Sequence, residues 1–523
     1  MTSEPVSRLN RAALLAAKSA GETETLEEVV IGRDVLELVS SAMYVDPMTI
    51  YREYIQNAAD AIDEARAQGL IGVDEEGAVS ISIDPAARSV LIRDNGVGLS
   101  NAVFPRKMAA LGASGKRGTS ARGFRGVGRL AGLGYAQELV FRSKTAADNS
   151  VSELTWDCRK LKTALRQSEG DLQDLIRSVA TLRKKPIADY PERFFEVELR
   201  GVVRLRSDRL MSPTAVDEYL AQVAPVPFAP EFHFGPEIRQ ALAPVVDLGE
   251  LMIRVGGNER PVYRPHRDLF RDDGDKTISF DRLSVSSIPG INGETAAIVW
   301  VLHHNYEGAL PNAAGVKGLR LRCGNVQIGE HFLLEELFPE TRFNAWSVGE
   351  VHVVDRKIIP NGRRDHFEQN AHYHNLTNQL APIAREIAKH CRTNSVRRKW
   401  QREFEMGVTS VREMLDVIAQ GSLGAKSLKQ VALSADQSLM KMTKISEMEI
   451  FVEHPEPHWQ AIAELREALR KVMADEREVS SPLMRLPDDE RQRFENFFEL
   501  VYECSSNRVA AKALIDKILL RLA

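Results

Sequence analysis

The sequence predicts an α+β protein with three parts: an N-terminal α/β sandwich of helices on a mixed sheet, a middle α/β domain and a helical C-terminal region. Three observations carry this prediction. A helical period gives way to alternating strands before residue 100, strand-like runs return between 295 and 355, and helical periodicity dominates from about Phe367 onward. A length of 523 residues leaves room for about three domains of roughly 150 residues each.

Composition narrows the class of protein. Hydrophobic residues make up 43% and charged residues 27%, which is typical of a folded globular chain. Lys plus Arg (69) nearly balances Asp plus Glu (73), so no global charge points to nucleic acid or a membrane surface. The four cysteines form no CxxC pair, which argues against a zinc or redox motif and suits a reducing cytoplasm. Since no apolar run approaches the roughly 20 residues of a membrane span, we expect a cytoplasmic protein.

The first elements can be read from their periodicity. Residues 8–22 read as an amphipathic strap rather than a targeting peptide, because their apolar run is short. The segment 25–66 is helical, with Ile50, Tyr54 and Ala58 on one buried stripe. Residues 78–84 and 89–94 alternate as two strands joined by a short turn.

Later elements follow from the same patterns. Strand-like runs are expected at 136–144, 151–157 and 193–205, with a polar, helix-like stretch at 159–182 among them. The Pro-rich segment 224–232 reads as a linker or domain edge. The helical region includes residues 460–478, an amphipathic stretch that could pair with a copy of itself.

Glu53, Asn57 and Asp60 form the first candidate group. Their spacings of four and three residues place all three on one side of the predicted helix. A solvated helix face explains the pattern equally well. However, Asn is unfavourable in the interior of a helix, so the position of Asn57 between two carboxylates is a reason to suspect a ligand site.

Asp94 begins the second candidate group, in the stretch DNGVGLS (94–100). Gly96 and Gly98 make a tight turn that would hold the Asp94 carboxylate at a sheet edge. An ordinary Asn-Gly hairpin turn is the alternative explanation.

A glycine-rich stretch, residues 99–128, forms the third candidate group. Its last glycines begin the segment GFRGVGRLAG (123–132), where backbone N–H groups at a helix start could bind phosphate. The stretch lacks the GxxxxGK[ST] pattern of a P-loop. GFRGVGRLAG itself follows a long polar loop, whereas a Rossmann turn directly follows a strand.

In this order and at these separations, the three groups resemble the Bergerat ATP-binding fold of the GHKL superfamily (gyrase, heat-shock protein 90, histidine kinases and MutL) over residues 25–205. The resemblance implies that Glu53 is the general base for ATP hydrolysis, that Asn57 binds Mg²⁺ and that Asp94 accepts a hydrogen bond from adenine. Residues 99–122 would be the lid. The implied nucleotide-binding residues are Asn57, Asp60, Asp94, Gly96, Gly98, Ser114, Gly115, Gly123, Arg125, Gly126, Val127 and Gly128.

Within the superfamily the sequence most resembles the heat-shock protein 90 (HtpG) branch. Histidine kinases usually end soon after the ATP domain, and no cleavage module of a type II topoisomerase is visible. The stretch 318–368 resembles the segment ending in that branch's catalytic-loop arginine, so Arg363 or Arg364 would reach the γ-phosphate. Lys317 is the rival, because gyrase-like and MutL-like members use a lysine. The expected threonine is absent from 193–201, and the family's C-terminal dimerisation domain is not recognisable.

The resemblance implies an ATPase that works as a homodimeric clamp closing on a protein client or partner subunit. A nucleic-acid clamp of the MORC or MutL type is the alternative, suggested by the helical tail and the basic, aromatic stretch 392–402. A module with an inactive ATP site is disfavoured because Glu53 is present. The expected parts are a strap (1–24), an ATP-binding domain (25–222), a middle domain (223–366) and a helical region (367–523).

Overall fold

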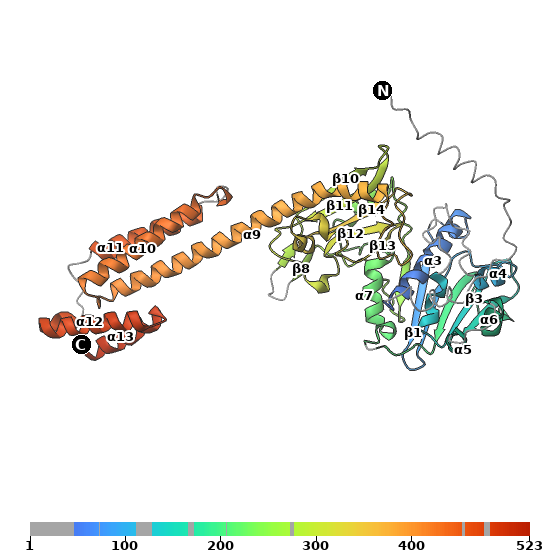
Figure 1. The fold of residues 1–523 in the computed structure, drawn as a ribbon, viewed down its shortest axis with the longest axis horizontal. Coiled ribbons are helices and arrows are strands. Elements are labelled where there is room, and N and C mark those ends of the chain that lie inside the picture. The colour runs from blue at the N-terminus through green and yellow to red at the C-terminus, as the bar shows by residue number, and fades with distance from the viewer. Residues whose placement is uncertain are drawn as a thin grey trace, which may run out of the picture. The chain divides into compact units, whose positions relative to one another are not determined.

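A computed structural model describes residues 46–72, 74–110, 128–165, 172–205, 207–271, 277–451, 456–474 and 482–522. The chain divides into two compact units (Figure 1). The first comprises the described residues up to Arg267 together with Leu321–Glu330 and His352–Gln369. The second comprises Asp268–Arg320, His331–Val351 and the chain from Asn370 onward. The expected boundary at residues 222 and 223 falls inside the first unit.

A seven-stranded mixed sheet forms the centre of the first unit, in the order β5-β4-β3-β6-β2-β1-β7. Its neighbours pair antiparallel except for β1 and β7, which run parallel. The strands are β1 (Ala78–Asp84), β2 (Ser89–Asp94), β3 (Glu138–Lys144), β4 (Val151–Asp157), β5 (Ala180–Lys185), β6 (Phe194–Arg200) and β7 (Met252–Val255). The mixed sheet of the predicted fold class is confirmed, and β1 and β2 have the expected bounds.

Helices complete the core of the first unit. The long helix α3 (Thr49–Ala67) packs on the sheet through Ile55, Ala58 and Ile62, which are all buried (Figure 1). The other helices are α4 (Phe104–Ala109), η2 (Gly128–Gly134), α5 (Cys158–Leu165), α6 (Leu172–Val179), η3 (Arg209–Met211), α7 (Pro213–Val223) and α8 (Gly235–Leu242). The apolar stripe of α3, which the helical spacing of its residues predicted, is therefore buried against the sheet.

Strand β5 was missed from the sequence. The stretch 159–182 was expected to be helical, and α5 and α6 occupy most of it, but its end turns into β5 at the edge of the sheet. Both faces of β5 are largely exposed, so its residues show no apolar alternation. Pairing with β4 makes it a strand.

The Pro-rich segment 224–232 is packed within the first unit, and its interpretation as a linker was wrong. Val226, Phe228 and Phe232 are buried. The carbonyl of Pro225 accepts a hydrogen bond from the Leu251 N–H at 2.9 Å. Proline here supplies carbonyl acceptors without needing a donor partner, which suits a buried extended segment.

The middle of the chain forms a second, five-stranded sheet in the order β10-β11-β14-β12-β13. Its strands are β10 (Arg282–Pro289), β11 (Thr295–His303), β12 (Gly318–Cys323), β13 (Val326–Ile328) and β14 (Val348–Val353). A separate hairpin consists of β8 (Leu269–Arg271) and β9 (Thr277–Ser279). Short 3-10 turns connect them: η4 (Asn312–Ala314), η5 (Glu335–Leu337) and η6 (Thr341–Trp346).

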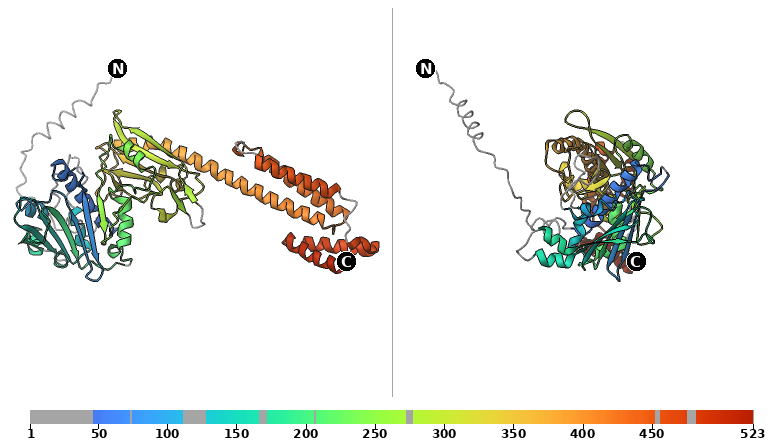
Figure 2. Two further views of the ribbon diagram at one scale, coloured as in Figure 1. Left: turned by 180° about the vertical axis from the view of Figure 1, so that it is seen from behind. Right: turned by 90° about the vertical axis from the view of Figure 1, so that its right-hand side faces the viewer.

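From Ala371 onward the described residues of the second unit are helical, as predicted. The 49-residue α9 (Ala371–Ala419) packs with α10 (Ala425–Ser446) and α11 (Glu456–Ala474), which lie beside its C-terminal half (Figures 1 and 2). The short η7 (Glu449–Phe451) joins α10 to this cluster. A smaller cluster joins η8 (Pro482–Arg485), α12 (Asp488–Cys504) and α13 (Arg508–Leu522). Among the described residues, no helix is both long enough and apolar enough to cross a bilayer.

Candidate functional site

The polar side of α3 is buried, so the interpretation as a solvated helix face is wrong. Glu53 is 7% exposed and Asp60 is 9% exposed, while Asn57 is half-buried. Burying a carboxylate costs free energy unless it gains partners or has a ligand to meet. The sequence places these groups on a helix whose other side is anchored in the core, so their positions are rigid.

Glu53 lies directly against the start of η2. At Gly128 a side chain would overlap the Oε2 atom of Glu53, so any larger residue would displace that carboxylate. The two segments are fixed together by Tyr54, whose hydroxyl accepts from the Gly132 N–H at 3.0 Å and donates to the Arg129 carbonyl at 3.1 Å. The end of the glycine-rich stretch is therefore held at the carboxylate of Glu53.

An arginine from a distant part of the same unit also reaches Glu53. The Nε atom of Arg364 lies 3.6 Å from the Oε1 atom of Glu53, and both side chains are buried. Arg364 has a φ of 57°, in the left-handed region, and its carbonyl accepts from the Gly329 N–H at 2.9 Å. A non-glycine residue in this conformation is uncommon and marks a backbone held by its surroundings.

Arg363 and Arg364 play different parts in this contact. The Arg363 side chain is exposed, and its carbonyl accepts a hydrogen bond from Nη2 of Arg52 at 2.7 Å. Arg52 also lies 3.9 Å from Glu53. The rival Lys317 belongs to the second unit, where its Nζ donates to the Asn312 side chain. Sequence reasoning missed Arg52, although its position next to Glu53 could have drawn attention to it.

Asp94 ends β2 as a buried carboxylate, 6% exposed. Burial raises the pKa of Asp94 to about 7, opposed by a hydrogen bond from the Gly96 N–H and by the charge of Arg193. A carboxyl with such a pKa changes its protonation near neutral pH, which is a mark of functional sites.

Gly96 and Gly98, the two glycines after Asp94, are each required by a different structural constraint. A side chain at Gly96 would overlap Ala61 of α3, and Gly98 has a φ of 70° and touches the Lys144 carbonyl. Both contacts bring the turn close to its neighbours, and neither leaves room for a Cβ. The turn that follows Asp94 is therefore rigid on both sides.

Arg193 holds the Asp94 turn from outside, and sequence reasoning missed it. Its guanidinium donates to the carbonyls of Asn95 and Gly96, and to the Leu70 carbonyl at 2.6 Å. It directly precedes β6, in the segment that lacks the expected threonine. An arginine before a strand is common, so the sequence carried no signal for this role.

Several expected site residues lie outside the described part of the chain: Ser114, Gly115, Gly123, Arg125, Gly126 and Val127. Residues 111–122, half of the expected lid at 99–122, lie there too. Within the described ranges, no group of three or more His, Cys, Asp and Glu side chains could hold a metal ion. Asn57 offers one amide oxygen, which fits Mg²⁺ because that ion commonly takes one or two protein oxygens together with substrate phosphates.

A family described as histidine kinase-, DNA gyrase B- and HSP90-like ATPase matches residues 47–182. These residues include α3, the turn after β2 and the start of η2. The chain contains a GHKL-type ATPase domain. The resemblance drawn from the three sequence motifs is thereby confirmed.

Curated relatives of this domain are HtpG chaperones. The protein from Polaromonas naphthalenivorans is 27% identical over 201 residues, which cover 34% of this chain and 30% of the relative. The one from Salinispora tropica is 35% identical over 98 residues, covering 18% of this chain and 15% of the relative. The one from Nitrosomonas eutropha is 25% identical over 214 residues, which cover 38% of this chain and 33% of the relative. The chain thus spans about a third or less of the length of these relatives.

Proposed function

We propose that this protein is an ATP-driven clamp of the heat-shock protein 90 type, which hydrolyses Mg-ATP to drive closure on a protein partner. The contact between Arg364 and Glu53 is the observation that carries the proposal. It brings a cation from a separate segment to the buried carboxylate of the ATPase domain. A static positive charge aimed at a reacting phosphate is the largest aid that a protein gives to phosphoryl transfer.

Glu53 is the proposed general base. Its carboxylate would take the proton of the attacking water, which a buried, rigidly held group can do without reorganisation. Gly128 leaves the space beside Glu53 free of any side chain. Arg364 would stabilise the charge that develops on the transferred phosphoryl group, and Arg52 would hold the loop of Arg364 through the Arg363 carbonyl.

The remaining contacts to the nucleotide follow the motif order. Asp94 would accept a hydrogen bond from the adenine amino group, and the rigid turn that contains Gly96 and Gly98 would line the base. Asn57 would bind Mg²⁺, which neutralises phosphate charge when bound, and Asp60 would add a polar contact. The proposed phosphate-side residues are Ser114, Gly115, Gly123, Arg125, Gly126, Val127 and Gly128.

Partners and location belong to the same proposal. The relatives that match the ATPase domain are named chaperones. We therefore propose a cytoplasmic homodimer that acts on a protein client or partner subunit. The C-terminal helices would supply part of the contact between copies, because amphipathic helices pair readily.

The nucleic-acid alternative has weaker support. In the basic stretch 392–402, Arg398 lies over the Trp346 ring at 5.4 Å, and Arg397 donates to the Ile450 carbonyl at 3.1 Å. Arg392 pairs with Glu340 at 2.9 Å, and Trp400 packs in the α9 core. Most of the side chains that suggested nucleic acid are thus used inside the second unit.

A comparison of the wild type with Glu53→Ala tests the proposal. Both proteins should bind ATP, and loss of the base should slow steady-state hydrolysis by about a hundredfold or more. Glu64→Ala is the matched control, because Glu64 is an exposed carboxylate on the same helix. Equal hydrolysis by wild type and Glu53→Ala would remove Glu53 from the mechanism. A wild type that binds no ATP would overturn the proposal.

A further inference from the structure

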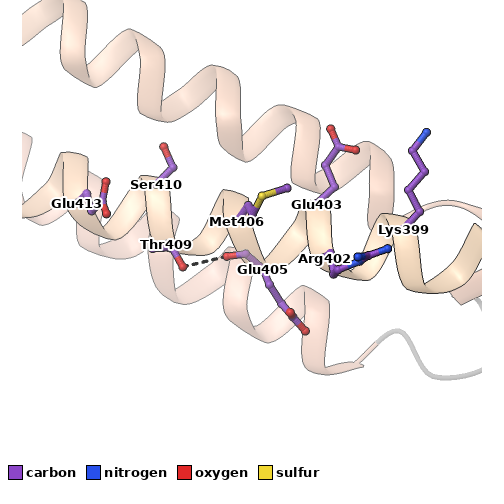
Figure 3. Close-up of a pocket in the computed structure, with 8 residues that line it drawn as sticks. All are labelled: Lys399, Arg402, Glu403, Glu405, Met406, Thr409, Ser410 and Glu413. Atoms are coloured by element: carbon purple, nitrogen blue, oxygen red, sulfur yellow. Dashed lines mark hydrogen bonds between the residues drawn. The ribbon is translucent and has the colours of Figure 1, made fainter. Parts of the chain in front are cut away.

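The outer side of α9 carries a stripe of side chains on the face opposite its core. Phe404, Val411 and Met414 point inward and pack with α10 and α11. On the opposite face, Met406 is 65% exposed. Eight residues of α9 line an open groove of about 740 Å³ there: Lys399, Arg402, Glu403, Glu405, Met406, Thr409, Ser410 and Glu413 (Figure 3).

The stripe has heptad spacing, but only Met406 in it is apolar, so opposite charges rather than an apolar core would hold a pair of helices together here. Lys399, Arg402, Met406, Thr409 and Glu413 are alternately three and four residues apart, as are the a and d positions of a heptad. The remaining lining residues flank the seam. Glu403 and Glu405 point to opposite sides of it (Figure 3), as e and g positions do.

Charge along the stripe is divided by sign. Lys399 and Arg402 occupy its N-terminal half, whereas Glu413 and Asp416 continue its C-terminal half. A parallel pair of α9 helices would place each of these charges against its own copy. Like charges face to face are unfavourable, so the parallel arrangement is selected against.

An antiparallel pair matches the charges. With Met406 opposite Thr409 of the second copy, a positions meet d positions along the seam. Arg402 then faces Glu413 of the second copy, and Lys399 faces Asp416 of the second copy. On the flank, Glu405 meets Arg412 of the second copy. Each pair combines opposite charges, and the two-fold symmetry repeats each of them.

From this pattern we infer that α9 crosses α9 of a second copy antiparallel over residues 399–416, with Met406 and Thr409 at its centre. The seam is about 27 Å long at 1.5 Å per residue. This interface deepens the proposed homodimer and does not depend on ATP chemistry. The stretch 460–478, whose sequence suggested that it could pair with a copy of itself, buries Ile462 and Leu465 against α9 and α10.

A second copy suits this surface better than nucleic acid. Glu403 pairs with Lys441 of α10 at 2.5 Å, but Glu405 and Glu413 share the stripe with Lys399 and Arg402, so a phosphate backbone would meet carboxylates along the groove. Nucleic-acid surfaces carry mainly one sign of charge. A self-complementary pattern of both signs is what an isologous interface requires.

Charge swaps in the full chain test the inference by sedimentation equilibrium at low salt. Lys399→Glu with Arg402→Glu turns the attractive pairs into repulsive ones, as does Glu413→Lys with Asp416→Lys. Each double variant should weaken self-association on the order of tenfold, since several exposed pairs change from attractive to repulsive at once. Combining all four changes restores opposite charges and should restore association. A fourfold variant as weak as the doubles would overturn the inference.

Cysteine cross-linking fixes the orientation. Cys504 is exposed, so the background is Cys504→Ser. Antiparallel crossing predicts a disulfide when Met406→Cys and Thr409→Cys chains are mixed, and none between Met406→Cys chains. Cross-linking of Met406→Cys with itself would show a parallel pair, and no cross-link in the mixture would show another interface. Either result overturns the inference.

Two further measurements, DNA retention and ATP hydrolysis, distinguish a failure of this inference from a failure of the proposed function. If Lys399→Glu with Arg402→Glu loses retention of a DNA fragment while association is unchanged, the surface binds nucleic acid and the inference fails. ATP hydrolysis is measured on the same samples. A chain that forms the seam but lacks hydrolysis would count against the proposed function alone, and active chains without the seam would count against the inference alone.

Discussion

The polar side of α3 and the outer stripe of α9 look alike in sequence but differ in the fold. Both are rows of charged and polar residues at helical spacing. On α3, η2 and the loop of Arg364 enclose Glu53, and Asp60 in the same row is buried as well. On α9 the described residues leave Met406 at the middle of the row 65% exposed to solvent. The comparison teaches that helical spacing identifies a polar face, whereas its neighbours decide whether that face serves chemistry or association.

Gly128→Ala should have the largest effect, because it closes the space beside the Glu53 carboxylate. We expect ATP hydrolysis to fall by about a hundredfold, as for a displaced catalytic group. A steady-state assay would measure the fall in hydrolysis, and calorimetric titration with ADP would show whether nucleotide binding is retained. Gly72→Ala is the control, because a methyl group there meets nothing within 4 Å. Equal activity of both variants would show that the enclosure of Glu53 is unimportant.

Arg364→Ala should follow, with kcat lowered about tenfold to a hundredfold, as when one preorganised charge is removed. Arg363→Ala should change kcat less than about twofold, because Arg363 contributes its carbonyl and its side chain is exposed. Paired measurements of kcat and KM decide between them. The reverse order would assign the γ-phosphate contact to Arg363.

Adenine binding should depend on pH through Asp94. Its pKa in the folded chain is about 7, so the carboxylate gains its charge as pH rises from 6 to 8, and nucleotide affinity should rise with it. The positive charge of Arg193 lowers the pKa of Asp94. Arg193→Gln removes that charge and should move the midpoint of the affinity profile to higher pH, whereas Arg193→Lys keeps the charge and should leave the midpoint unchanged. Calorimetric titration of ADP across this range is the measurement. Identical profiles for Gln and Lys variants would exclude a charge effect of Arg193.

The same pKa has a consequence for stability. Because the folded pKa of Asp94 lies above its ordinary value, the folded state binds the proton more tightly than the unfolded chain does. This contribution to stability is present at low pH and is lost as pH rises toward 7. Asp94→Asn should remove that part of the pH dependence. Denaturant unfolding of both proteins at pH 5 and pH 8 checks the sign.

Met406→Ser should give the smallest effect on stability, within about 0.5 kcal/mol, because its side chain is 65% exposed. It should still weaken self-association, since Met406 lies at the centre of the inferred seam. Chemical denaturation and sedimentation report the two effects separately. A large loss of stability would mean that Met406 is packed and that the contrast with α3 is false.

Much of the fold could be predicted because its signals are local. The alternation of residues 78–94 predicted β1 and β2, and the period from Phe367 predicted the C-terminal helices. The order of the α3 group, the Asp94 turn and the glycine-rich stretch identified the ATPase family. Short-range spacing determines which face a side chain takes, so these features needed no knowledge of distant contacts.

Other features depend on contacts between segments far apart in the chain. β5 is a strand because β4 pairs with it, and the Pro-rich segment is buried because β7 and its neighbours close over it. The choice of Arg364 over Arg363 at Glu53 rests on a backbone with a φ of 57°, held by Gly329. The sequence by itself determined the elements and the motif residues. Only the tertiary structure decided which polar groups are enclosed, because enclosure comes from neighbours that spacing along the chain does not encode.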